Sequence, residues 1–217
     1  MDNKTKVIRF EIDGQWRVDD MAQSLSHLRD LYNLRLLLQI QSEDYRDIEE
    51  FWHEMHHFPP FRKVLKKRML YPWFYPHLPA IPTDVTELSQ LSSFFYPEEQ
   101  FVIRRIEYGS PGLKDLAGIG EIVGHIKDFM LKLIEYYVER RKRNLENAER
   151  ELRNEGLRIE NARKFVRLAK DCGYSESEIR KLTSWVDERQ ETFIILIENG
   201  NIRSVKILND NKHDNID

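Results

Sequence analysis

The stretch Lys6–Asp13, KVIRFEID, alternates apolar and polar side chains over most of its length. An alternation with a period of two predicts a β-strand with one buried face. Asp13-Gly14 follows directly and is a strong turn signal, because glycine tolerates a positive φ. We therefore expect a hairpin here, with a short return strand over residues 15–18.

Further strands are predicted in the middle and at the end of the chain. Phe101–Tyr108 (FVIRRIEY) is rich in β-branched and aromatic residues and is followed by a glycine. Thr192–Glu198 (TFIILIE) and Asn201–Leu208 (NIRSVKIL) flank Asn199-Gly200, the clearest hairpin signal in the chain. Strands at both ends with helical patterns between them predict a helix-rich α+β fold, in which the N-terminal, central and C-terminal strands form a small antiparallel sheet.

Helix starts and stops are marked by capping residues. A first helix is expected to begin at Asp19 or Asp20, and a second to run from Ser42 to near His57, before two prolines. Ser110-Pro111 combines a capping hydroxyl with a proline and predicts another helix start. Gly173 is expected to stop a helix, and the Ser175-x-x-Glu178 capping box to open a short last one.

The segment from about Leu113 to Lys170 contains no proline, and its apolar residues recur at heptad spacing. A continuous helix of this length would be roughly 80 Å long, more than a small domain can cover. We therefore expect an arm that pairs with a second helix, either as a coiled coil between chains or as a hairpin folded back near Gly156. Its predicted interface residues are Ile126, Met130, Leu133, Tyr137, Arg141, Leu152, Ile159 and Val166, and Arg141 would set the register.

This pattern predicts three parts: a head domain (1–110 with 174–208), a helical arm (111–173) and a disordered tail (209–217). The corresponding function is that of a soluble, non-enzymatic assembly protein, which self-associates or binds a partner protein through the arm. No nucleophile motif, phosphate-binding glycine loop or dinucleotide fingerprint is present, so the sequence names no enzyme class.

Composition limits the alternatives. The 217 residues carry a net charge of −3, which argues against a generally basic nucleic-acid binder. A single cysteine excludes a disulfide scaffold and a cysteine-rich zinc site, and suits a reducing, cytoplasmic location. No apolar stretch is long enough to predict a transmembrane segment, and the first residues lack a signal-peptide pattern.

An alternative function is that of a zinc-dependent hydrolase. His53-Glu54-Met55-His56-His57 matches the pattern HExxH, in which two histidines one helical turn apart bind zinc and the glutamate polarises water. The prolines that follow and a charged residue at Glu50 argue against it. A third ligand would have to come from His77 or Glu87. A polar helix end without metal explains the same residues.

A further alternative is nucleic-acid binding through the basic and aromatic segment 61–75. Basic side chains contact phosphates and aromatic rings stack on bases in single-strand binders. The acidic residues of the preceding segment could instead neutralise this charge within the chain. The candidate residues are Arg62, Lys63, Lys66, Lys67, Arg68 and Trp73.

The glycines Gly118, Gly120 and Gly124 contain a GxxxG step next to a basic block. This spacing allows helices to approach closely, in water or at a membrane surface. The charged residues between these glycines and the block argue against a membrane-spanning helix, so close helix packing is the expected role.

Overall fold

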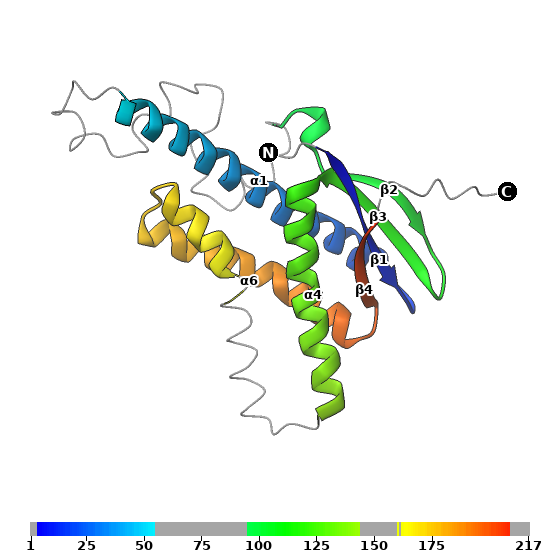
Figure 1. Cartoon of the computed structure of the whole chain (residues 1–217). Helices are drawn as coiled ribbons and strands as arrows, with labels where there is room; N and C mark the ends of the chain where they lie inside the picture. Colours follow the sequence, from blue (N-terminus) through cyan, green and yellow to red (C-terminus); the bar gives the residue numbers. More distant parts are fainter. Residues whose placement is uncertain (1–3, 55–94, 144–159, 161, 209–217) are drawn as a thin grey trace.

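The computed structural model describes residues 4–54, 95–143, 160 and 162–208, and it shows a four-stranded antiparallel sheet with helices on one side (Figure 1). The predicted α+β class is confirmed. In chain order the elements are β1 (Thr5–Ile12), α1 (Val18–Glu54), η3 (Pro97–Glu99), β2 (Val102–Glu107), β3 (Gly112–Ile119), α4 (Gly120–Arg143), α6 (Glu176–Glu198) and β4 (Ile202–Leu208). Residues 162–171 are also helical.

The sheet has the order β2-β3-β1-β4, so the predicted strands at the two ends of the chain pair with each other. In β1, Ile8, Phe10 and Ile12 are at most 1% exposed and face the helices. Ile8 lies opposite Leu116 of β3 and Ile207 of β4. The alternation in the sequence therefore marks the central part of the sheet.

Helix α1 is the most deeply buried element. Every residue from 30 to 39 is buried, and both α4 and α6 pack against this helix. The predicted break at Ser42 is wrong, because α1 continues without interruption to Glu54. No proline or glycine lies within these 37 residues, and a serine inside a helix does not end it.

The expected hairpin at Asp13-Gly14 is also wrong. Gly14 has a φ of 73° and turns the chain, but the chain then enters α1 and no return strand forms over residues 15–18. The backbone N–H of Asp13 instead donates to the carbonyl of Asn201 at 2.9 Å. The long-range partner β4 thus takes the place that a local return strand would have filled.

The helix predicted to start at Ser110-Pro111 is replaced by strand β3. The Ser110–Pro111 peptide bond is cis and lies in the turn between β2 and β3. The sequence of β3, GLKDLAGI, has little intrinsic preference for a strand. Its conformation is fixed by pairing with β1 on one side and β2 on the other.

Thr192–Glu198 was expected to be a strand but forms the last turns of α6. The β-branched residues of this segment are typical of a strand. Its buried residues nevertheless follow the helical period of the preceding turns; they are Phe193, Ile194, Leu196 and Ile197. Gly200, with a φ of 76°, ends the helix rather than a hairpin. The Ser175–Glu178 capping box and the helix stop at Gly173, another glycine with positive φ, are confirmed.

The part of the predicted apolar seam that lies on α4 is buried within this chain. Ile126, Met130, Leu133 and Tyr137 lie on α4, are at most 5% exposed and belong to the main core. Val166 is half-buried, and the side chains of Arg141, Leu152 and Ile159 lie outside the described residues. A coiled-coil arm is not confirmed, and the division into head, arm and tail stays a prediction.

Tyr32 joins α1 to the sheet. Its hydroxyl accepts a hydrogen bond from the Ile119 N–H and donates one to the Glu99 carbonyl, both at 2.8 Å. Burial raises the pKa of Tyr32 to about 12, so the hydroxyl keeps its proton for this double role. A Cβ at Gly118 would lie 2.7 Å from the Tyr32 ring, which only glycine avoids at this position.

The two glycines Gly118 and Gly124 allow a matched test of this junction. We expect Gly118→Ala to lower the free energy of unfolding by about 1–3 kcal/mol, because Tyr32 is buried and cannot move aside. Gly124 is inside α4, and a Cβ there meets nothing within 4 Å. Gly124→Ala should therefore raise stability by roughly 0.5–1 kcal/mol. Urea unfolding of the three proteins measures both changes, and equal effects would contradict the Tyr32 contact.

Candidate functional site

Strand β2 forms one edge of the sheet, and all six of its residues are exposed. Three of them are large and apolar: Val102, Ile103 and Ile106 are 40%, 54% and 42% exposed. Tyr108, which directly follows this strand, and Tyr96, which precedes η3, are each 67% exposed. We call these five residues the edge patch. A concentration of exposed apolar side chains on an open strand is typical of a surface that contacts another molecule.

The position of the edge patch follows from the pairing of β2 with β3. Ile103 lies opposite Leu116, and Ile106 lies opposite Lys114. Leu116 and Lys114 are themselves opposite Ile8 and Phe10, which are covered by the helices. Ile103 and Ile106 therefore continue the helix-covered face of the sheet beyond the point where the cover ends.

Strand β4 forms the opposite edge of the sheet, and its exposed side chains are basic. In β4, the apolar Ile202 and Val205 are at most 5% exposed, whereas Arg203 and Lys206 point to solvent. Lys206 also donates to Glu11 of the neighbouring strand at 2.6 Å. Buried apolar groups and exposed lysine or arginine are how sheets protect a free edge from further pairing. Only β2 combines an edge position with exposed apolar side chains among the strands that the structure describes.

Charges of both signs accompany the edge patch. Arg105 forms an ion pair with Glu107 two residues further along the same strand. Next to Arg105 on β3, the carboxylate of Asp115 is held by Arg9 through two hydrogen bonds of 2.8 and 2.7 Å. The register of β2 against β3 shifts between Ile103 and Arg105, as in a β-bulge. The stretch 105–107 beyond the bulge is regularly paired.

Lys114, a buried amine on β3, lies opposite Ile106 of the edge patch. Its side chain is fully buried, its Nζ donates to Ser24 Oγ at 3.0 Å, and it lies 4.0 Å from the centre of the Trp16 ring. Burial lowers the pKa of Lys114 to about 7. An amine of this kind is a nucleophile when neutral. No solvent reaches it here, so its contacts serve packing between β3 and α1.

The two alternative sites from the sequence fall largely outside the described residues. His53 and Glu54 are in the last described turn of α1, but their side chains are not among those described, and His57 lies outside the described residues. The basic and aromatic residues between 61 and 75 also lie outside the described part. Within it, no group of three or more His, Cys, Asp or Glu side chains is arranged to hold a metal ion. The zinc and nucleic-acid sites stay predictions.

The edge patch was missed because a single sequence does not reveal strand order. FVIRRIEY predicted a strand, and the structure confirms it, but the same letters would suit a covered strand. The arginine pair in its middle was the one signal of an exposed edge.

The chain matches no protein-family model, no curated protein and no solved structure. In the described parts of the chain, no helix has the length and apolar character needed to cross a membrane. We therefore infer the function of the chain from the geometry of the edge patch and from physical chemistry.

The buried amine gives a pH test of this region. Between pH 7 and about 10, the Lys114 amine is neutral in the folded protein and charged in the unfolded chain, so unfolding takes up a proton. The free energy of unfolding should rise with pH by up to about 1.4 kcal/mol per unit relative to Lys114→Met, and should show no such rise below pH 6. Urea unfolding at several pH values measures this, with the exposed Lys181→Met as control. A difference from Lys114→Met that is the same at all pH values would contradict a buried amine.

Proposed function

We propose that this chain is a non-enzymatic assembly protein that forms a symmetric dimer by pairing β2 with β2 of a second copy. The observation that carries this proposal is the exposure of Val102, Ile103 and Ile106 on an open sheet edge. Such an edge can add a strand through main-chain hydrogen bonds, while its side chains select the partner. Burial of the α4 seam in the core favours this surface over a helical arm.

A second copy is the occupant that the charges of β2 fit. In a symmetric antiparallel pair, residues are exchanged about a two-fold axis, so each contact is made twice. When the axis passes Ile106, this residue lies opposite itself, and Arg105 lies opposite Glu107 of the second copy. When the axis passes Arg105 instead, this arginine lies opposite its own copy, and the two like charges disfavour that register.

The Ile106 register also explains how the charged groups of the edge are satisfied. Arg105 and Glu107 pair with each other in the single chain and would exchange partners between chains on assembly. The apolar groups of Ile106 and Tyr108 would be removed from water at about 25 cal/mol per Å². Only a few residue pairs form, so we expect a dissociation constant on the order of micromolar, as for small interfaces.

The first test of the dimer introduces a charge at its centre. Ile106→Lys should convert the dimer to a monomer, because two lysines would then oppose each other on the two-fold axis. Multi-angle light scattering across about 1–100 µM, a range that brackets the expected dissociation constant, measures the mass of the protein in solution. The control is Ile195→Lys on α6, since Ile195 is similarly apolar and 52% exposed but does not lie in the sheet. A wild-type protein that is monomeric throughout this range would refute the proposal.

The second test exchanges the charges. Arg105→Glu and Glu107→Arg should each weaken association at least tenfold, because each places like charges opposite one another across the two-fold axis. Mixed in equal amounts, the two variants should associate again, since every facing pair then combines opposite charges. The ion pair within each chain stays broken in the mixture, so recovery reports on the contact between chains. No recovery would exclude the Ile106 register.

A further inference from the structure

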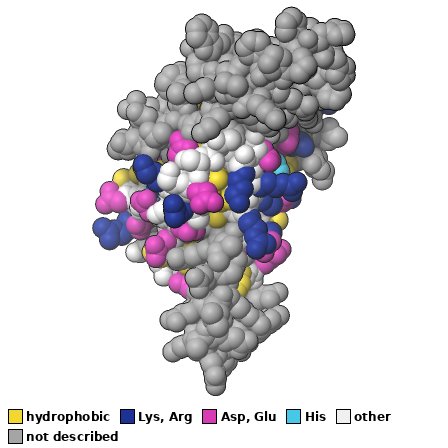
Figure 2. Space-filling model, turned by 90° about the vertical axis from the view of Figure 1, so that its left-hand side faces the viewer, with side chains coloured by type: hydrophobic (Ala, Val, Ile, Leu, Met, Phe, Trp, Pro, Cys, Tyr) yellow, Lys and Arg dark blue, Asp and Glu magenta, His cyan; other side chains and the backbone are white. Residues whose placement is uncertain are grey.

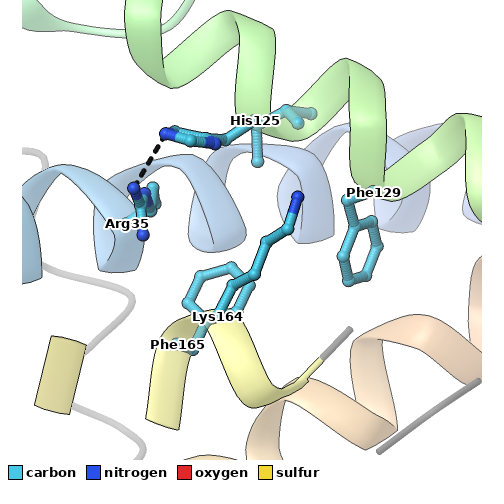
Figure 3. A pocket seen from close by; sticks show the side chains of 6 residues that line it. Arg35, His125, Phe129, Lys164 and Phe165 are labelled. Carbon is cyan, nitrogen blue, oxygen red and sulfur yellow. Dashed lines mark hydrogen bonds between the residues drawn. The ribbon is translucent and has the colours of Figure 1, made fainter. Parts of the chain in front are cut away.

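Two hydrogen bonds between side chains join α1 to α4. Arg35 and Gln39 lie one turn apart on α1, and Glu121 and His125 lie one turn apart on α4. A terminal nitrogen of Arg35 lies 2.8 Å from Nε2 of His125 (Figure 3), and Nε2 of Gln39 donates to Glu121 at 2.6 Å. A small pocket, lined in part by Ile126, lies beside these bonds. The same two turns of helix are therefore held together twice.

The contact with Arg35 fixes the protonation state of His125. A guanidinium has N–H donors but no acceptor, so Nε2 of His125 must accept the hydrogen bond. A ring nitrogen that accepts carries no proton, and the neutral ring then holds its proton on Nδ1. In a protonated ring both nitrogens donate, and two positively charged groups would face each other across 2.8 Å. This contact between α1 and α4 therefore requires neutral His125.

The charged groups around His125 act on it in both directions. Burial lowers the pKa of His125, and Arg35 of α1 and Lys164 of the helical residues 162–171 lower it further. Glu121 and Asp128, which lie on α4 itself, raise it. On the face in Figure 2, basic side chains gather beside a histidine. The side chain of His125 is 31% exposed, so water can deliver a proton to it.

Glu121 offers a protonated His125 a second partner on the same helix. Its Oε1 lies 3.9 Å from Nε2 of His125, and side chains four residues apart are neighbours on a helix. This distance is too long for a hydrogen bond, but rotation of the side chains can shorten it. The same Oε1 accepts from Gln39, which also donates to Glu43 of α1 at 3.3 Å. A donating His125 would compete with Gln39 for Glu121.

We propose that His125 is an acid-sensitive switch at the contact between α1 and α4. At neutral pH its ring accepts the hydrogen bond from Arg35 and joins the two helices. In mildly acidic solution Nε2 binds a proton from water, leaves Arg35 and donates to Glu121. Gln39 then keeps its partners on α1, which are Arg35 and Glu43. Both bonds between the helices are weakened together, and this inference is independent of dimer formation.

Nuclear magnetic resonance of the intact protein between about pH 4 and 8 tests the exchange of partners. His125 should titrate with a pKa below about 6.5, the value of an exposed histidine. The side-chain amide signals of Gln39 should shift with the same midpoint, because Gln39 loses Glu121 when the ring gains it. A Gln39 amide that stays unchanged while His125 titrates would overturn the exchange. A pKa of His125 at or above 6.5 would overturn the contact with Arg35.

Two substitutions should move the pKa of His125 in opposite directions. Arg35→Met removes the facing charge and should raise it. Glu121→Gln keeps an acceptor for Gln39 but removes the negative charge, and should lower the proton affinity of His125 at least about threefold. Glu121 is 40% exposed, so this variant should fold even where Arg35→Met does not.

Glu135→Gln is the matched control. It removes the same charge from an exposed position further along α4 and should leave the pKa of His125 unchanged. Equal effects of Glu121→Gln and Glu135→Gln would overturn the role of Glu121, because the change would then come from the net charge of the protein.

His125→Gln gives a readout of stability, because glutamine keeps an acceptor for Arg35 and does not titrate. Above pH 6.5, His125 is neutral in both the folded and the unfolded chain. Below it, the unfolded chain binds the proton first, since the pKa is lowered in the folded protein. The unfolding equilibrium constant of the wild type relative to His125→Gln should therefore rise as the pH falls, by at most about tenfold per pH unit. His27 is present in both proteins, so its titration cancels. A ratio that is independent of pH would overturn the proposal.

Discussion

The burial of α1 is the constraint on which the other elements depend. Residues 30–39 are buried all around this helix, with α4 and α6 against it and the sheet reached through Tyr32. Gly118 must lack a side chain for the Tyr32 ring to fit. A helix with no solvent face must also satisfy its polar groups internally. Asn33 and Arg35 do so incompletely, because each has a buried side-chain nitrogen without a hydrogen-bond partner.

The same arrangement explains the open sheet edge. α4 contacts β1, β3 and β4, and in Figure 1 the helices gather on the side of the sheet away from β2. β2 therefore receives hydrogen bonds from β3 but no cover for Ile103 and Ile106. Dimer formation would cover this edge.

The sequence predicted part of the candidate sites. It identified β2 as a strand and the seam of α4 as apolar, because both follow from local periodicity. It assigned Ile126 to an interface, whereas the structure places this residue in the core and at the pocket wall. Arg35 carried no signal, since a single arginine on a helical pattern is ordinary. Its hydrogen bond with His125, ninety positions away along the chain, is a result of tertiary structure.

Local sequence patterns were enough to predict the α+β class, the positions of β1, β2 and β4, and the caps at Ser175 and Gly173. Alternation and capping involve neighbours along the chain, so they can be read from the order of residues. Tertiary structure decided that Gly112–Ile119 is a strand, that Thr192–Glu198 is a helix, and which apolar stripes meet one another. Hydrogen bonds between distant strands and burial against distant helices stabilise these choices, and they outweigh the local preferences of the residues concerned.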